Sequence, residues 1–527
     1  MSSRAHYRLR PMISGRLVQG YTFRRRNIAY LRLWLGRLVF WGGAVGVGLL
    51  AVGFANLSEH ALHRFMNTYH AYFWMPFIVT PLGGALCVYL TRRFFPGAEG
   101  SGIPQAIAEL SRPKQGLWKP LVSIRIIFGK ILIGTLAVGC GFSLGREGPT
   151  VQVGASLMDA IHRFLPRTLF IQRSHLLIAG GAAGIAAAFN TPLAGIMFAI
   201  EEMSRGVETR MSGLVITAII LAGVVAQALL GGGNYFGHIF IGGGQSDTIK
   251  AVAVSSLVCG LAGGVFSRIL VGSATSWTGV IADYRRDHPI RFAAISGLIV
   301  AVLGVLTGGI LFGSGYEPTR ALLEGHADLP WYFGPLKFVS TLIAYLSGLP
   351  GGIFAPSLAI GAGIGHDLAP LVGQVATPGM LLVLCMAGFL AAATQAPLTS
   401  FIIVMEMADG YSIVIGLMAT ALLSSGLSRL ISPPLYHTIA NLMHARQRAA
   451  ANAAALATAP TEPPSAEATP PHSPSPTEES LNEAASVEKT PTEAASTEVT
   501  STEVTSTEVT STEVASTEDA TTEIKRL

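Results

Sequence analysis

The chain has 527 residues, of which 50% are apolar and 13% are charged, with a formal net charge of +5. Soluble domains carry about 25% charged residues, so this composition indicates a protein whose main solvent is lipid. A soluble protein with a very large core is disfavoured, because long uncharged runs follow one another at 213–233, 292–312 and 379–405. Runs of about 18 or more apolar residues can cross a hydrocarbon layer of about 30 Å.

The N-terminal segment is strongly basic. Residues 1–37 contain nine arginines and no acid, and the first long uncharged stretch starts only at Leu38. That start is late for a secretory signal, whereas an arginine-rich organelle transit peptide is an open alternative. We expect residues 1–27 to form a basic arm that its charge holds on the cytoplasmic side.

Three glycine- and proline-rich breaks interrupt the apolar sequence: GSGIP at 100–104, GREGP at 145–149 and GGIFAP at 351–356. Proline suits the first turn of a helix, so each break predicts a helix start. A helix start leaves free backbone N–H groups with partial positive charge, and these can bind an anion. Each break alone is also compatible with an ordinary helix kink, but three of the same composition favour a converging anion site.

Acidic residues accompany these breaks. Glu147 lies inside the second helix start, where its carboxylate could compete with an anion or simply cap the helix. Glu201 and Glu202 follow the uncharged run 176–200, and adjacent helical residues point about 100° apart. The two acids therefore face different surroundings. We expect Glu201 to meet a structural partner such as Arg205 and Glu202 to accept protons.

Two further polar residues stand in apolar sequence. Lys130 could raise the electrostatic potential along a pathway or pair with an acid, and the sequence does not choose between these. Tyr436, which follows two prolines, could direct its hydroxyl inward or anchor the chain at the membrane interface.

An internal repeat relates two halves of the chain, at roughly 28–230 and 249–430. The segment 149–155 matches 356–362 at an offset of 207, and AAAFNTPL at 186–193 matches AAATQAPL at 391–398 at an offset of 205. A weaker match pairs GSG at 100–102 with GSG at 313–315. Such repeats with broken apolar segments place a binding site at the repeat interface, but the sequence does not say whether they run parallel or inverted.

The C-terminal part differs in composition. We expect a final helix at about 434–448 and, from 449 to 527, a disordered acidic tail of low complexity. This tail has fourteen acids against three basic residues and repeats STEVT between 496 and 510.

The three breaks, in this order, resemble the signature of the CLC family of chloride channels and chloride/proton exchangers. NTPLAGIMFAIEEM at 190–203 and PLY at 434–436 extend the resemblance over roughly residues 28–448. It implies an all-α integral membrane protein in which two inverted repeats bring broken, tilted half-helices together at an anion site. It also implies a homodimer with one pathway per subunit.

The resemblance assigns roles to individual residues. Glu147 would be the gating glutamate, and Glu202 the inner proton acceptor of the exchangers. Chloride would be bound by the hydroxyls of Ser101 and Tyr436 and by residues at the helix starts, namely Gly102, Ile103, Arg146, Gly148, Ile353 and Phe354. Ser101 stands where nitrate-preferring relatives have proline, which favours chloride.

We therefore predict a chloride/proton antiporter with a glutamate gate; a passive gated chloride channel on the same fold is the alternative. Glu202 favours exchange, because channel-type members commonly lack this acid. Gln105, Ala106 and Ile107 stand where many exchangers carry acids, which leaves the inner proton route open.

No zinc HExxH motif or P-loop is present, so we expect no enzyme activity. The four cysteines lie in apolar stretches without CxxC spacing and predict neither a metal site nor a disulfide framework. The expected partners are chloride, protons, the lipid bilayer and a second copy of the chain, with no cofactor and no nucleic acid. Because the regulatory domains of many relatives do not follow the body, we expect a bacterial inner membrane with both termini cytoplasmic.

Overall fold

The computed structural model describes residues 14–112, 120–165, 171–204, 213–231, 245–326, 328–372 and 377–458. Within these ranges the regular elements are helices, and one isolated bridge joins Gly145 to Gly352. Residues 1–13 of the predicted arm, Arg205 and residues 459–527 of the predicted tail lie outside the described ranges.

The first half of the body contains short and long helices in alternation. They are α1 (Ser14–Ala71), α2 (Pro76–Phe94), α3 (Ile103–Leu110), α4 (Ile124–Gly139), α5 (Glu147–Ile161), α6 (Arg173–Phe189), α7 (Pro192–Phe198) and α8 (Gly213–Leu230). A 3₁₀ turn (His162–Phe164) follows α5, and one π-helical turn, η3 (Ala199–Met203), follows α7.

The second half repeats this order. Its helices are α9 (Gln245–Thr275), α10 (Val280–Asp287), α11 (Pro289–Leu306), α12 (Tyr316–Leu323), α13 (Phe333–Leu346), α14 (Phe354–Val372), α15 (Pro378–Thr394), α16 (Pro397–Met407) and α17 (Val414–Ile431). A 3₁₀ turn (Gly410–Ile413) precedes α17, and α18 (Leu435–Thr458) closes the body.

Length and composition make five of the described helical segments able to cross a membrane. They lie at Leu33–Ala71, Gly213–Leu230, Thr248–Thr275, Pro289–Leu306 and Gly410–Ile431. Large apolar side chains are exposed on these helices, for example Leu49, Ile220 and Leu422. A surface of this kind is stable in hydrocarbon, so the body is that of a multi-pass membrane protein.

The repeat predicted from sequence is visible in the local geometry. Gly102 before α3 and Gly315 before α12 both adopt the left-handed conformation, with φ of 99° and 87°. Asn190 after α6 and Gln395 after α15 do the same, with φ of 58° and 59°. Helices α3 to α8 therefore have counterparts in α12 to α17.

The two repeats are inverted, as a pair of carboxylates demonstrates. Glu201, just after α7, accepts hydrogen bonds from the backbone N–H groups of Leu398 and Thr399 at the start of α16, at 3.0 and 2.7 Å. Glu406, at the end of α16, accepts from Leu193 and Ala194 at the start of α7, at 3.2 and 2.9 Å. The end of each helix meets the start of its counterpart, so these equivalent helices run antiparallel.

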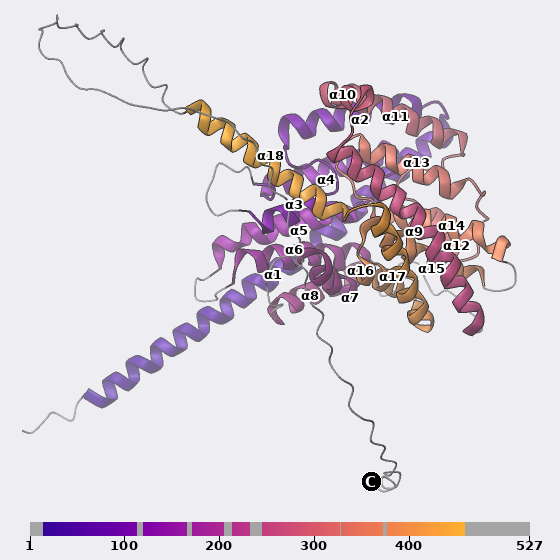
Figure 1. Ribbon diagram of the computed structural model, residues 1–527. Coiled ribbons are helices and arrows are strands. Elements are labelled where there is room, and N and C mark those ends of the chain that lie inside the picture. The colour runs from indigo at the N-terminus through magenta and orange to yellow at the C-terminus, as the bar shows by residue number, and fades with distance from the viewer. Residues whose placement is uncertain are drawn as a thin grey trace, which may run out of the picture. The chain divides into compact units, whose positions relative to one another are not determined.

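Glycines allow two pairs of helices to cross at short distance. Helices α5 and α6 touch where Gly154 meets the backbone of Gly180, and α14 and α15 touch where Gly361 meets the carbonyl of Cys385. Figure 1 shows α5 and α6 side by side, and α14 beside α15. Small residues let helix backbones approach in lipid, where packing replaces the hydrophobic effect.

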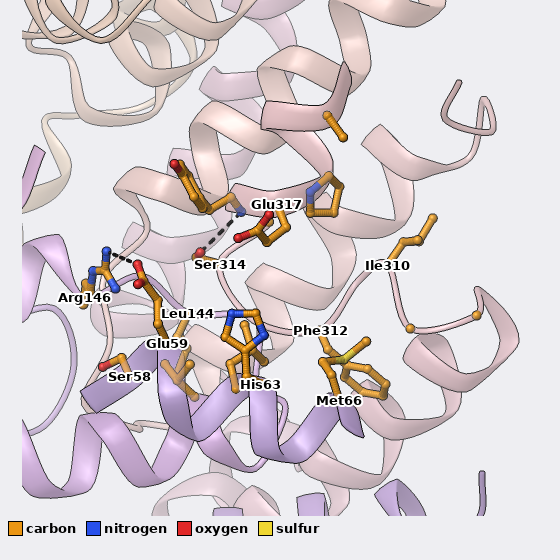
Figure 2. Close-up of a pocket in the computed structure, with 18 of the residues that line it drawn as sticks. Ser58, Glu59, His63, Met66, Leu144, Arg146, Ile310, Phe312, Ser314 and Glu317 are labelled. Carbon is orange, nitrogen blue, oxygen red and sulfur yellow. Dashed lines mark hydrogen bonds and ion pairs between the residues drawn. The ribbon is translucent and has the colours of Figure 1, made fainter. Parts of the chain in front are cut away.

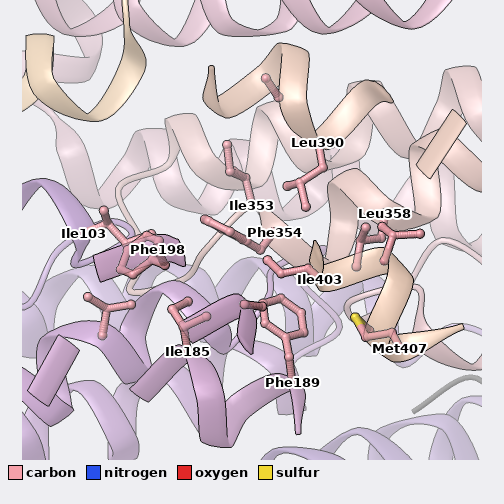
Figure 3. Close-up of a cluster of buried hydrophobic side chains, with 14 of the residues drawn as sticks. Ile103, Ile185, Phe189, Phe198, Ile353, Phe354, Leu358, Leu390, Ile403 and Met407 are labelled. Atoms are coloured by element: carbon pink, nitrogen blue, oxygen red, sulfur yellow. The ribbon is translucent and has the colours of Figure 1, made fainter. Parts of the chain in front are cut away.

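The large apolar core surrounds the start of α14. Ile353 and Phe354 are buried, and the ring of Phe354 lies 6.0 Å from that of Phe189 and 6.4 Å from that of Phe198. Figure 3 shows these side chains gathered from helices of both halves. A backbone N-terminus held inside such a core has no water to satisfy it.

The final helix is longer than predicted. It continues to Thr458, ten residues beyond the expected end at 448 and into the segment expected to be disordered. The sequence there, AAANAAALAT, is rich in alanine, the strongest helix former. The change in composition at Ala449 therefore marks an alanine-rich continuation of the helix and not its end.

Candidate functional site

The three glycine-rich breaks meet at one place. Gly145 and Gly352 exchange two backbone hydrogen bonds of 2.8 and 2.7 Å, and the N–H of Gly351 donates to the carbonyl of Gly100 at 3.1 Å. The start of α5 thus lies against the start of α14, and Gly148 also packs against Ser101 at the start of α3. The predicted convergence of helix starts is confirmed.

Glycine is required at this junction by close packing. A Cβ on Gly352 would lie 2.9 Å from the backbone nitrogen of Gly148 and 3.3 Å from the ring of Pro149. A Cβ on Gly102 would lie 2.9 Å from Gln152 and would also be strained by the positive φ. The absence of these side chains lets three helix starts share one small volume.

Two buried hydroxyls at the junction have no hydrogen-bond partner among the described residues. The N-cap residues of α3 and α5, Gly102 and Arg146, provide no side-chain cap. The hydroxyls of Ser101 and Tyr436 are about 1% exposed, lie near each other and make no hydrogen bond of good geometry. Buried polar groups are nearly always paired, so these two hydroxyls indicate a site for a ligand that accepts hydrogen bonds.

Tyr436 reaches this junction from the far end of the chain. It lies in the first turn of α18, and its ring stacks on that of Phe354 at 6.2 Å with an interplanar angle of 8°. This stacking holds the hydroxyl inside the protein at 1% exposure. Of the two orientations open from the sequence, the structure has the inward one.

Glu147 occupies the other side of the junction. Its side chain is 1% exposed and its carboxylate faces the backbone N–H groups of Arg146, Glu147 and Ala355. One oxygen, Oε2, makes no hydrogen bond of good geometry to the described residues. The carboxylate therefore lies where an anion would be bound by the starts of α5 and α14.

The side chain of Arg146 points away from this junction. Its guanidinium donates to the carbonyl of Ala55 and to Glu59 Oε1, both at 2.8 Å on α1. Figure 2 shows the Arg146–Glu59 pair. What Arg146 offers the junction is thus its backbone N–H, while its charge ties α5 to α1.

A cavity of about 510 Å³ opens beside Glu147 and Arg146. Its walls come mainly from α1 and from the segment 308–318, and they are mainly apolar (Figure 2). Besides Glu147 and Arg146, the titratable groups on them are Glu59, His63, His70, Tyr316 and Glu317. Glu202 is not among its lining residues. The cavity gives Glu147 an aqueous approach from one side of the junction.

Glu202 lies in the π-helical turn η3 and is 2% exposed. Its Oε1 is 3.6 Å from Nε2 of His437, the residue after Tyr436. Its neighbour Glu201 instead caps α16 and also accepts from the Thr399 hydroxyl at 2.8 Å. The expected separation of the two acids is thus present, but the structural partner of Glu201 is a helix start and not the suggested Arg205, which lies outside the described residues.

Two buried lysines anchor the repeated GSG segments. Lys130 Nζ donates to the carbonyl of Gly100 at 2.6 Å, which fixes the backbone next to Ser101. Lys337, 207 residues later, donates to the carbonyls of Leu311 and Gly313 at 2.9 and 2.8 Å. Lys337 was not predicted from the sequence, although it lies at the repeat offset of 207 from Lys130.

The other residues missed from sequence are Glu59 and His437. Neither belongs to a motif, and each acquires its place through a contact between helices distant in the chain. The spacing of residues along the sequence carries no signal for such contacts.

A junction of helix starts, buried among membrane-crossing helices of two inverted repeats, defines a membrane transport protein. A family model described as "Voltage gated chloride channel" matches residues 83–429. The "H(+)/Cl(-) exchange transporter ClcA" of Salmonella schwarzengrund (strain CVM19633) is 30% identical over 432 residues, which cover 78% of this chain and 90% of that relative. The chain therefore belongs to the CLC family.

Solved structures share the fold. The crystal structure of a slow cyanobacterial Cl⁻/H⁺ antiporter covers 78% of this chain and 99% of its own, with a TM-score of 0.68 at 24% identity. That of a CLC-type fluoride/proton antiporter covers 79% and 98%, with a TM-score of 0.63 at 23% identity. At these identities the likeness concerns the fold alone.

Proposed function

We propose that this protein exchanges chloride for protons across a membrane, with Glu147 as the gate. The observation that carries the proposal is the position of the Glu147 carboxylate on backbone N–H groups from two helix starts. An ionised carboxylate there excludes chloride by occupying its place. A protonated one is neutral, binds these groups less strongly and can move into the cavity beside it.

Chloride is then held by the same backbone groups and by the two inward hydroxyls. The N–H groups of Ile353 and Phe354, those of residues 146–148, and the start of α3 at Gly102 and Ile103 supply partial positive charge. Ser101 and Tyr436 supply hydroxyl donors. Partial charges bind a halide weakly enough to release it, whereas a lysine ammonium in contact with it would hold it longer. Lys130 is consistent with this, because its ammonium binds the carbonyl of Gly100.

Protons enter the cycle through the two acids. Glu147 meets the water-accessible cavity, and Glu202 lies apart from that cavity in the π-helical turn. Protonation of Glu147 makes the anion-binding site available to chloride. Transfer of that proton toward Glu202 ionises Glu147 again, and its carboxylate then reoccupies the site. The name of the Salmonella relative, a H(+)/Cl(-) exchange transporter, supports this assignment.

The family and the positive charge of the N-terminal segment support a proposal for the assembly and the location of the protein. We propose a homodimer in a bacterial inner membrane, with the arm at 1–27 and the segment 449–527 in the cytoplasm and the transport domain at 28–448. Nine arginines within residues 1–37 favour the cytoplasmic side for the N-terminus.

The test uses purified protein in sealed liposomes, with a chloride gradient and the voltage set by an ionophore. Proton movement against its own gradient identifies exchange, and chloride flux without proton movement identifies a passive channel. Glu202→Gln should largely stop proton movement while chloride still flows, and Glu147→Gln should end coupling as well. Glu317→Gln is the matched control, because Glu317 is an exposed carboxylate on the wall of the same cavity.

A further inference from the structure

The proton acceptor Glu202 is buried, and this raises the question of how it exchanges protons with water. Its side chain is 2% exposed, in a turn that continues α7 and packs against α6. Proton transfer needs groups within hydrogen-bond reach or separated by one water molecule. A carboxyl at this depth therefore requires an intermediate group.

The segment after GSGIP does not provide that group. Gln105 replaces an acid there, and its amide donates to the carbonyl of Glu99 at 2.5 Å. Glu109 is 3% exposed and is committed to Arg112, Arg173 and the N–H of Leu121, at 2.9, 2.8 and 2.9 Å. The side chains of Gln105 and Glu109 are thus occupied by structural hydrogen bonds and ion pairs, so the proton route must use other residues.

His437 is placed to connect Glu202 with the surface. Its Nε2 lies 3.6 Å from Glu202 Oε1, and its side chain is 20% exposed where that of Glu202 is 2% exposed. It follows Tyr436 in α18, and adjacent helical positions point about 100° apart. One turn of α18 thus presents a hydroxyl to the anion junction and an imidazole to the proton acceptor.

We infer that His437 passes protons between water and the buried carboxylate of Glu202. This inference rests on the proposed exchange of chloride for protons. In the inward direction of transfer, the Nε2–H bond of the imidazolium breaks and an Oε1–H bond forms on Glu202, which leaves both groups neutral. The neutral imidazole then regains a proton from solvent at Nε2, the atom that released it, after the ring turns this atom toward its exposed side, and the reverse sequence releases one.

The chemistry of imidazole suits this step. The ordinary pKa of histidine, about 6.5, is close to neutral pH, so both of its forms are accessible. The distance of 3.6 Å between His437 Nε2 and Glu202 Oε1 is longer than a hydrogen bond of about 3 Å. A small rotation of the ring or one bridging water closes this difference.

The experiment measures chloride and proton fluxes of His437→Gln in the same liposomes as the wild type. Loss of a positioned acid–base group should lower proton flux roughly tenfold or more, with a smaller loss of chloride flux. His366→Gln is the matched control, since His366 is also partly exposed and contacts a carboxylate, that of Asp328, at 2.9 Å. Its fluxes should equal those of the wild type.

Chemical rescue separates a relay from a structural role. Imidazole added to the buffer should restore proton flux in His437→Ala but not in Glu202→Gln. His437→Asp, which keeps a titratable group, should retain more proton flux than His437→Gln, and chloride flux reports correct folding of each variant. An unchanged proton flux in His437→Gln, or no rescue of His437→Ala, would overturn the inference, whereas a wild type without uphill proton movement would refute the proposed function itself.

Discussion

Replacing Glu201 by glutamine tests the division of roles between the two adjacent acids. The carboxylate of Glu201 accepts three hydrogen bonds at the start of α16, two from N–H groups at 3.0 and 2.7 Å and one from the Thr399 hydroxyl at 2.8 Å. Glu406 makes the equivalent cap on α7 with two bonds, at 3.2 and 2.9 Å. The substitutions Glu201→Gln and Glu406→Gln both keep the shape of the side chain and remove its charge.

The expected loss of stability follows from these bonds. A hydrogen bond to a charged group contributes about 1.5–3 kcal/mol, and glutamine keeps one acceptor oxygen. Two of the bonds to Glu201, those from the N–H and the hydroxyl of Thr399, end on Oε2, so Glu201→Gln keeps both by placing its amide oxygen there and loses the one from Leu398. Glu406→Gln also loses one, so each variant should lose about 1.5–3 kcal/mol. The free energy of unfolding should therefore fall by a similar amount in Glu201→Gln and Glu406→Gln.

The assay is equilibrium unfolding of the purified variants in mixed micelles, followed by flux measurements on the folded protein. The ratio of proton to chloride transport in Glu201→Gln should equal that of the wild type, unlike that of Glu202→Gln. Wild-type stability in Glu201→Gln, or loss of coupling in it, would refute the assignment of Glu201 as a helix cap.

Three further substitutions probe the junction. Gly352→Ala places a Cβ 2.9 Å from the nitrogen of Gly148, and a strain of about 1–3 kcal/mol should weaken chloride binding roughly tenfold in calorimetry. Lys130→Met removes one of two donors to the carbonyl of Gly100, the other being the N–H of Gly351, and the lost bond from a charged group should cost about 1.5–3 kcal/mol in the free energy of unfolding; unchanged stability would contradict the anchoring role. Ser101→Pro removes a hydroxyl from the anion site and should shift selectivity toward nitrate in anion-exchange flux, so unchanged selectivity would place Ser101 outside the site.

Much of the architecture could be predicted from the sequence because it rests on local signals. Glycine and proline mark helix starts wherever they interrupt an apolar run, and GREGP and GGIFAP do begin α5 and α14. The angular separation of neighbouring helical residues also distinguished Glu201 from Glu202. The matching offsets of the repeat indicated two related halves, which the left-handed conformations of Asn190 and Gln395 reproduce.

The contacts between distant helices could not be predicted in this way. The reciprocal caps of Glu201 and Glu406 join residues about 200 positions apart, and they depend on the inversion that spacing alone left open. The guanidinium of Arg146 binds α1 for the same reason, since only the packed helices bring Glu59 to it. Composition also misplaced the end of α18, because alanine continues a helix in a segment that otherwise looks disordered.

The central claim is that backbone N–H groups and two hydroxyls bind an anion where Glu147 otherwise lies. The most direct measurement is the anomalous scattering of bromide in crystals of the wild type and of Glu147→Gln. We expect bromide at the starts of α5 and α14, within contact of the N–H groups of Ile353 and Phe354, with higher occupancy in the variant. Bromide absent from this junction in both proteins, or unaffected by the loss of the carboxylate, would contradict it.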